Sequence, residues 1–393
     1  MKQGLVTAAR LSFVAAALAL SPPAAEAASF TVLHNFTGYQ TGDGAQPTSG
    51  VLPARHGGFY VATREGGPRD EGTLTLIRKD GSAQVLHAFA GADDGANPQA
   101  TPLLWTDGNL YGTVTNEGPA GCGAVYRYSP ASSAYQQLYA FQCAPDGAFP
   151  SASLTDTGRG VLVGTTSSGG SNNGGSTFIV RPDGTVGQGC SFDGGAFPYA
   201  AITEVPVADE FTVTLEGGSA FDGTIVRFHE TCFGTAIHTF MGGSDGAQPS
   251  GSLLYYNNAL YGTTSGGGVN GLGIVFRVNP DGTNYTVLHT FQGICCGNRD
   301  GSFPASGLTL DPKDGMLYGT TIKGGNSSDN GTIFKIDPNT GAEQAIYAFS
   351  GRDGAYPHGD LYIKKGKIYG TTANGGTGAQ CASGCGTVFR LKT

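Results

Sequence analysis

The sequence predicts an all-β protein that forms a single seven-bladed β-propeller of four-stranded blades. Three observations support this prediction. Stretches that read as strand, glycine turn and strand recur along the chain, as in Leu260–Val278, Leu317–Ile336 and Ile368–Leu391. One turn motif returns seven times, at a spacing of about fifty residues. Helical periodicity is absent after the N-terminal segment, so the repeats are built from strands.

Each repeat carries three landmarks that together mark four strands. The first is a turn with the pattern Asp-Gly-Ala-x-Pro, degraded in one copy. Its prolines are Pro47, Pro98, Pro150, Pro198, Pro249, Pro304 and Pro357. The second is a Leu-Tyr-Gly-Thr strand, and the third is a strand that opens on glycine and leads through a turn to a strand ending on phenylalanine. Four short strands at this period are typical of propeller blades.

The two ends of the chain complement one another. The last repeat has only three strands after Pro357, and the missing fourth type, Val-Leu-His-x-Phe, stands at Val32–Phe36. The N-terminal strand is therefore expected to close the last blade. Such closure of the ring removes the open strand edges that would otherwise promote aggregation.

The first 27 residues read as a secretory signal peptide. Lys2 and Arg10 supply positive charge, and the apolar run Leu11–Leu20 is too short to span a bilayer. Ala25–Ala27 offers a small-residue cleavage site. Residues 28–393 are expected to form the propeller. The protein is expected to be secreted, extracellular or periplasmic, and not to insert into a membrane.

The charge balance disfavours two classes of partner. The chain has 22 Lys and Arg against 30 Asp and Glu, a formal net charge of −8. Nucleic acids and anionic membrane surfaces select for basic patches, so neither is expected as a partner.

The chain contains 66 glycines without the three-residue period of collagen. These glycines are therefore assigned to turns and to close packing of strands. A monomer is expected.

The repeat resembles two known families. Its apolar strand running into a diglycine, followed by a Gly-Thr-Val-Phe-Arg strand, a turn and a Val-Leu-His-x-Phe strand, is similar to the kelch blade plan. More closely, Leu260–Gly268 and Asp245–Pro249 resemble the GloVer tandem-repeat family of secreted bacterial proteins. The resemblance covers essentially all of residues 30–393. It implies a seven-unit extracellular repeat protein and carries over no catalytic residues.

The Asp of each turn motif has two interpretations. Asp accepts backbone N–H bonds, Gly adopts positive φ, and Pro starts a strand where no ladder donor is needed, so the motif fits a tight turn. The alternative is a ring of carboxylates that binds calcium, which prefers six to eight oxygen ligands. Because no clustered Asp-x-Asp-x-Asp loop occurs, the turn is favoured. No metal site or cofactor is assigned, and calcium remains an open alternative.

Histidines recur at one position, shortly before the strand-ending phenylalanine. They are His34, His87, His238 and His289, and Tyr139 and Tyr347 fill this position in other repeats. A position that also accepts tyrosine is a packing position, so metal ligation by these histidines is not expected.

The eight cysteines predict disulfides if the compartment is oxidising. Cys381 and Cys385 share one loop and are expected to pair. Cys122 starts a third strand and Cys143 follows the fourth strand beside it, so these two form the second predicted disulfide. Cys190 and Cys232 are interpreted as free, because they are placed at opposite ends of a blade. None of the cysteines has the spacing of a zinc site.

Two columns of residues flank the turn prolines and vary between polar and aromatic types. The candidate ligand-binding residues are Gln99, Tyr199 and His358 after the proline, and Phe149, Phe197, Phe303 and Tyr356 before it. Arranged around an axis on the loop-rich face, these columns could form a bowl that binds a sugar or a peptide. The alternative is that the aromatic residues only plug the central channel.

The sequence favours a secreted, non-catalytic propeller that binds an extracellular carbohydrate or protein, provided that Gln99, Tyr199 and His358 share one surface. The first alternative is an enzyme acting on extracellular polysaccharide, a hydrolase or lyase, with His358 and Asp360 as weak acid–base candidates. The second is a structural envelope or matrix protein. The fold cannot separate these classes, because function depends on sites that a fold carries.

Overall fold

The computed structural model describes residues 29–39, 42–192, 196–206, 210–214, 217–218, 220–228, 234–294 and 300–392. The predicted signal peptide, residues 1–27, lies outside these ranges. The only helix in the described part of the chain is the short 3-10 element η1 (Gly243–Asp245). No helix in the described ranges has the length and apolar character needed to cross a membrane.

The strands form five four-stranded sheets, two five-stranded sheets and one two-stranded sheet. The first two sheets contain β2 (Leu52–Pro53), β3 (Phe59–Thr63), β4 (Thr73–Ile77) and β5 (Ala83–Ala88), then β6 (Leu103–Leu104), β7 (Leu110–Val114), β8 (Ala124–Ser129) and β9 (Ala134–Ala140). The next contains β11 (Thr155–Asp156), β12 (Leu162–Thr166), β14 (Ser176–Val180) and β15 (Val186–Ser191), and β10 (Gly147–Ala148) pairs with β13 (Ser168–Gly169) beside it.

The second half of the chain repeats this plan. Two sheets contain β16 (Thr203–Glu204), β17 (Glu210–Thr214), β18 (Thr224–Phe228) and β19 (Thr235–Thr239), then β20 (Leu254–Tyr256), β21 (Ala259–Thr264), β22 (Ile274–Val278) and β23 (Thr286–Thr290). The five-stranded sheets contain β24 (Ser302–Pro304), β25 (Thr309–Leu310), β26 (Leu317–Lys323), β27 (Thr332–Ile336) and β28 (Glu343–Ala348), then β29 (Ala355–Pro357), β30 (Tyr362–Ile363), β31 (Lys367–Asn374), β32 (Thr387–Lys392) and β1 (Ser29–Asn35).

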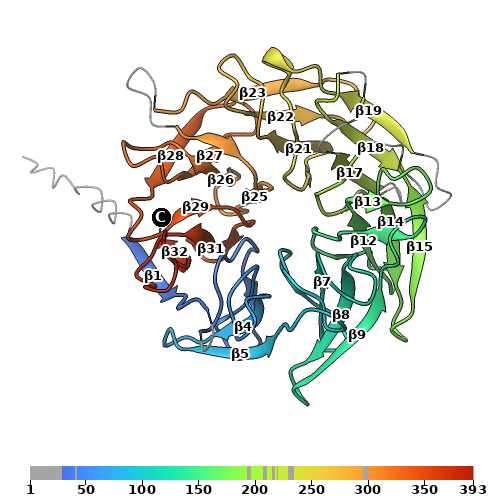
Figure 1. Ribbon diagram of the computed structural model, residues 1–393. Helices are drawn as coiled ribbons and strands as arrows, with labels where there is room; N and C mark the ends of the chain where they lie inside the picture. Colours follow the sequence, from blue (N-terminus) through green and yellow to red (C-terminus); the bar gives the residue numbers. More distant parts are fainter. Residues whose placement is uncertain are drawn as a thin grey trace, which may run out of the picture.

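The sheets follow one another around a common centre and form a β-propeller (Figure 1). The N-terminal strand β1 pairs antiparallel with β32, from Ser29 opposite Lys392 to Asn35 opposite Thr387. This pairing confirms that the N-terminal strand completes the last sheet. The all-β propeller is confirmed as well, whereas the predicted number of seven blades is a finer statement and remains a proposal.

Neighbouring sheets pack through large apolar side chains. Leu74 and Phe89 of one sheet belong to the same buried cluster as Leu110 and Tyr126 of the next, and each is at most 1% exposed. Burial of such a side chain stabilises the folded state by about 1.5–3 kcal/mol. The cluster that contains Phe36 and Val61 joins the last sheet to the first in the same way.

Two glycine positions that recur within the repeat have steric causes. In the Leu-Tyr-Gly-Thr strand, Gly262 lies opposite Phe276, and a Cβ on this glycine would lie 2.5 Å from the Phe276 ring. Gly273, which opens the third strand, has φ +94°, and a Cβ there would collide with the Thr264 carbonyl and lie 2.6 Å from Pro304. Pro304 belongs to the turn motif of the next sheet. The absence of a side chain at Gly273 therefore lets the turn of the next repeat pack against this strand.

Both predicted disulfides are present, Cys122–Cys143 and Cys381–Cys385. Cys190 is also disulfide-bonded, so its interpretation as a free thiol is wrong. It lies two residues before Phe192, at the position that His or Tyr occupies in other repeats, and is buried there instead of standing at a free blade end. Cys232 lies outside the described residues.

Candidate functional site

The residues that follow the turn prolines line a single cavity of about 210 Å³, the axial cavity. The column directly after the proline contributes Thr48, Gln99, Ser151, Tyr199, Ser250, Ala305 and His358. Residues one and two positions further along contribute most of the remaining wall. Because all repeats contribute to its wall, the cavity lies where the sheets meet.

The backbone of this wall is held by threonines of the second strands. Thr263 Oγ1 donates a hydrogen bond of 2.9 Å to the Ser306 carbonyl of the next sheet, and Thr113 Oγ1 donates one of 3.3 Å to the Ala152 carbonyl. Thr371 Oγ1 donates in the same way to the Ser49 carbonyl and so connects the last sheet to the first. These threonines are buried. The wall is thus fixed by repeated positions, and its side chains are free to differ.

A further series of hydrogen bonds crosses the wall from sheet to sheet. Each runs from a backbone N–H in one repeat to a side-chain oxygen at the matching position of the next. The bonds are Gly50 to Thr101 (2.7 Å), Thr101 to Ser153 (3.1 Å), Ala201 to Ser252 (3.2 Å) and Gly307 to Asp360 (2.7 Å). Asp360 is thereby oriented by a backbone donor of the preceding sheet.

Of the residues that the structure describes, Asp360 and His358 are the only carboxylate and imidazole that line the axial cavity. Both residues are exposed to solvent, although the cavity wall stands close around them. This partial desolvation raises the pKa of Asp360 and lowers the pKa of His358, so both shift toward their neutral forms. Among the described residues no hydrogen bond joins the two, so they are neighbours in one cavity and not a connected acid–base pair.

The rest of the lining offers neutral hydrogen-bonding groups. Thr48 Oγ1 and Ser151 Oγ are buried and have no hydrogen-bond partner among the described residues. The Gln99 amide donates to Thr115 Oγ1 at 3.2 Å, and the Tyr199 side chain is 43% exposed. Unsatisfied buried polar atoms cost roughly 1–3 kcal/mol each. The cavity therefore presents hydroxyl groups and an aromatic ring that a polar, uncharged ligand can satisfy.

The structure brings Gln99, Tyr199 and His358 together, as the binding hypothesis requires. The predicted residues before the proline, Phe149, Phe197, Phe303 and Tyr356, are not among the residues that line the axial cavity. The physical reason lies in their backbone. Phe303 has φ +57°, and its N–H donates to the Leu272 carbonyl of the preceding sheet at 2.8 Å.

This left-handed conformation occurs in every repeat. The residues are Gln46, Asn97, Phe149, Phe197, Gln248, Phe303 and Tyr356, with φ from +48° to +57°. The column before the proline therefore belongs to the contact between repeats. Thr48, Ser151 and Ser250 share the column of Gln99 and Tyr199 and line the cavity with them. Their position in the repeat was the available signal.

The turn aspartates have the structural role favoured by the sequence. Asp94 accepts hydrogen bonds from His87 Nε2 (3.0 Å) and the Ala90 N–H (3.0 Å). Asp353 accepts them from the Tyr347 hydroxyl and the Ser350 N–H. The rings of His87 and Phe89 pack edge to face at 4.8 Å, which confirms the packing role of the histidine position. Calcium binding by the turns stays a prediction.

Comparison with known proteins places the chain in a family and supports the fold. The family model of the Gloeobacter/Verrucomicrobia repeat matches residues 20–208 and 208–393. No curated protein matches the sequence. Virginiamycin B lyase from Staphylococcus aureus is similar in structure, with a TM-score of 0.61, 16% identity and coverage of 93% of this chain and 99% of that chain. A streptogramin B lyase structure has a TM-score of 0.60, 14% identity and coverage of 93% and 97%.

Proposed function

We propose that the chain, which belongs to the Gloeobacter/Verrucomicrobia repeat family, is a secreted, non-catalytic β-propeller that binds an extracellular carbohydrate in its axial cavity. One observation carries the proposal. The cavity is lined by hydroxyl and amide side chains from several repeats, with one partly exposed aromatic ring, Tyr199. An uncharged polyhydroxylated ligand matches this lining in hydrogen-bonding capacity and in charge.

The size of the cavity favours the end of a glycan chain over a long internal segment. A volume of about 210 Å³ equals the space of roughly seven water molecules at about 30 Å³ each. The tyrosine supplies an apolar face with a polar tip, which is a common combination at binding surfaces. A protein ligand is the second class considered, and it would need a loop or side chain that enters the cavity.

The remaining parts of the proposal rest on the repeat and the disulfides. We assign seven blades, one to each four- or five-stranded sheet, and the seven copies of the repeat support this assignment. The Cys122–Cys143 and Cys381–Cys385 bridges are of the kind that an oxidising compartment preserves, which supports secretion. A monomer is proposed because ring closure leaves no open sheet to complete.

The test is binding of the purified protein to a broad glycan array, with and without EDTA. Selective binding that falls at least about tenfold in Gln99→Ala and Tyr199→Ala supports the proposal. Phe221→Ala, which removes an aromatic ring that is 70% exposed outside the cavity, is the matched control and should bind normally. A blank array, or equal binding by all variants, contradicts the proposal. A protein ligand would then be sought by affinity capture.

An extracellular lyase or hydrolase is the second candidate function. The observation in its favour is that His358 and Asp360 both line the axial cavity. The similar solved structures include a streptogramin B lyase and a catalytically inactive virginiamycin B lyase with quinupristin, but their identity to this chain is low. Each bound glycan should be incubated with the protein and analysed for cleavage. Cleavage that is abolished by His358→Gln would favour the enzyme over the binding protein.

A further inference from the structure

A stacked contact between neighbouring sheets recurs near the ends of the fourth strands. In three repeats the ring two residues before the strand-ending phenylalanine is covered by an aromatic ring of the next sheet. The pairs are His87 with Tyr135 (centroids 3.8 Å apart), His238 with Tyr285 (3.7 Å) and Tyr347 with Phe30 (4.1 Å). In the first two pairs the tyrosine hydroxyl also donates to the backbone carbonyl of the turn Asp.

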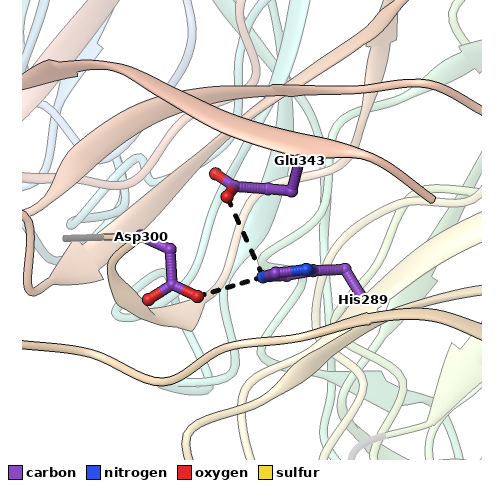
Figure 2. A group of neighbouring side chains, drawn as sticks. All are labelled: His289, Asp300 and Glu343. Atoms are coloured by element: carbon purple, nitrogen blue, oxygen red, sulfur yellow. Dashed lines mark hydrogen bonds and ion pairs between the residues drawn. The ribbon is translucent and has the colours of Figure 1, made fainter. Parts of the chain in front are cut away.

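His289 departs from this arrangement. The covering residues Tyr135, Tyr285 and Phe30 each stand four residues before the His or Tyr of their own strand, and the matching residue over His289 is Glu343. Glu343 begins β28, whereas His289 lies on β23 of the preceding sheet. Figure 2 shows the side chains of His289, Asp300 and Glu343 pointing toward one another. A carboxylate thus occupies a position that an aromatic ring fills elsewhere.

The geometry of this cluster is compact. His289 Nε2 lies 3.1 Å from Asp300 Oδ2 and 4.0 Å from Glu343 Oε2. One ligand atom from each of the three residues lies within 4.8 Å of the others. In a tetrahedral zinc site with bonds near 2.1 Å, neighbouring ligand atoms lie about 3.4 Å apart. The two distances from His289 Nε2, 3.1 Å and 4.0 Å, lie on either side of this spacing.

Glu343 is buried without adequate partners. Its side chain is 6% exposed, and its Oε1 has no hydrogen-bond partner among the described residues. Its one ion-pair partner in the described part of the chain is His289, which Asp300 already engages. When both carboxylates are ionised, they face one imidazole with an excess of negative charge that a divalent cation would neutralise.

We infer that His289 Nε2, Asp300 Oδ2 and Glu343 Oε2 bind a divalent transition-metal ion, with Zn²⁺ the best match. An imidazole with two carboxylates suits Zn²⁺, whereas Ca²⁺ and Mg²⁺ prefer oxygen ligands alone. The ligands are already oriented. The Gln292 N–H donates to Asp300 Oδ2 at 3.1 Å, and the Phe291 ring packs edge to face on His289 at 4.9 Å. Water completes the coordination.

The ion is a structural link between two sheets. Its ligands come from β23, from the turn before β24 and from β28. Since an ion that binds only the folded protein shifts the folding equilibrium, Zn²⁺ should raise the midpoint of thermal unfolding. At His87 and His238 the stacked tyrosines Tyr135 and Tyr285 provide the corresponding link without an ion.

The test is equilibrium dialysis of the EDTA-treated full chain against ZnCl₂, with the bound metal quantified. We expect one ion per chain in the wild type and an affinity at least about 100-fold lower in Glu343→Tyr, because loss of a ligand should exceed the 10–100-fold effect of losing a supporting residue. Tyr stands at the matching position in two other repeats, as Tyr135 and Tyr285, so this variant should fold. If Glu343→Tyr does not fold, the zinc affinity is measured in Glu343→Gln, whose side chain is close in shape to that of the wild type. His87→Gln, at a contact covered by Tyr135, is the matched control and should leave zinc binding unchanged.

Cobalt substitution identifies the ligands. Co²⁺ bound to imidazole and carboxylates lacks the thiolate charge-transfer absorption that a cysteine site produces. The inference is overturned if the wild type binds no zinc, if Glu343→Tyr and Glu343→Gln bind it as tightly as the wild type, or if Co²⁺ shows thiolate bands. A zinc-dependent rise in the unfolding midpoint that both variants lose would support it.

Discussion

The contacts between sheets and the wall of the axial cavity use the repeat in opposite ways. Between sheets the same residue types recur. The glycine that opens the third strand meets the proline of the next turn at Gly273 and Pro304, and again at Gly386 and Pro47. In the cavity, one backbone position carries Tyr, His, Gln, Ser, Thr or Ala in different repeats. The first region is constrained by packing, and the second is constrained only by what must fit in the cavity.

This difference gives a rule for reading the chain. A residue type that recurs at a packed position reports how the ring is built, and a departure from it calls for a separate explanation. Glu343 is such a departure, because it is the one charged residue at a position that is aromatic in three other repeats and small or aliphatic in the remaining three. Substitutions at repeated positions should therefore change stability, whereas substitutions at varied cavity positions should change binding and leave stability almost unaltered.

The largest effect is expected at the glycine that opens a third strand. Gly273→Ala should lower the free energy of unfolding by more than about 3 kcal/mol, because a left-handed backbone is combined with a collision between Cβ, the Thr264 carbonyl and Pro304. Gly271→Ala is the control. Gly271 has φ +69° with no atom near its Cβ position, so the loss should be about 1–2 kcal/mol. Urea unfolding measures both, and equal losses would show that the contact with Pro304 is unimportant.

Much of the fold could be predicted because its signals are local and repeated. The turn prolines, the glycines and the strand-ending phenylalanines each report a steric requirement that is the same in every copy. The missing fourth strand of the last repeat likewise predicted the pairing of β1 with β32. The disulfides Cys122–Cys143 and Cys381–Cys385 followed from the strand order.

The details of the sites depend on geometry that residue types do not reveal. Gln, Asn, Phe and Tyr share no strong preference for positive φ, so the sequence could not show that the column before the proline turns toward the preceding sheet. The cluster around Glu343 joins residues of two repeats, and its unusual residue becomes visible only when fourth strands are compared four positions before the His or Tyr. Cys190 was misinterpreted for a similar reason, because its burial depends on tertiary packing.

An intermediate effect is expected at the turn aspartates, and it depends on pH. Burial alone would raise the pKa of Asp146, but hydrogen bonds from the Gln142 N–H, Gln188 and Tyr139 together hold it below its ordinary value. A carboxylate with a lowered pKa in the folded state stabilises the protein above the pKa of the unfolded chain. That contribution is lost as pH falls through the folded-state value.

Asp146→Asn should therefore reduce stability by about 1–2 kcal/mol at neutral pH and weaken the further loss seen as pH falls below about 4. Denaturant unfolding at a series of pH values measures both quantities. Asp93→Asn, at an exposed residue beside another turn, is the control and should follow the wild type. If Asp146→Asn loses as much stability at low pH as the wild type does, the hydrogen bonds to Asp146 do not cause the acid sensitivity.

The smallest change in stability is expected in the axial cavity. Tyr199→Ala and Ser250→Ala should each change the free energy of unfolding by less than about 0.5 kcal/mol, because their side chains are only partly buried. Thr263→Val, which removes the bond to the Ser306 carbonyl in the wall of the same cavity, should cost about 1–2 kcal/mol. If Tyr199→Ala destabilises the protein as much as Thr263→Val does, Tyr199 fills the channel as a packing residue. The varied column would then belong with the contacts between sheets, and the axial cavity would lose its strongest argument as a binding site.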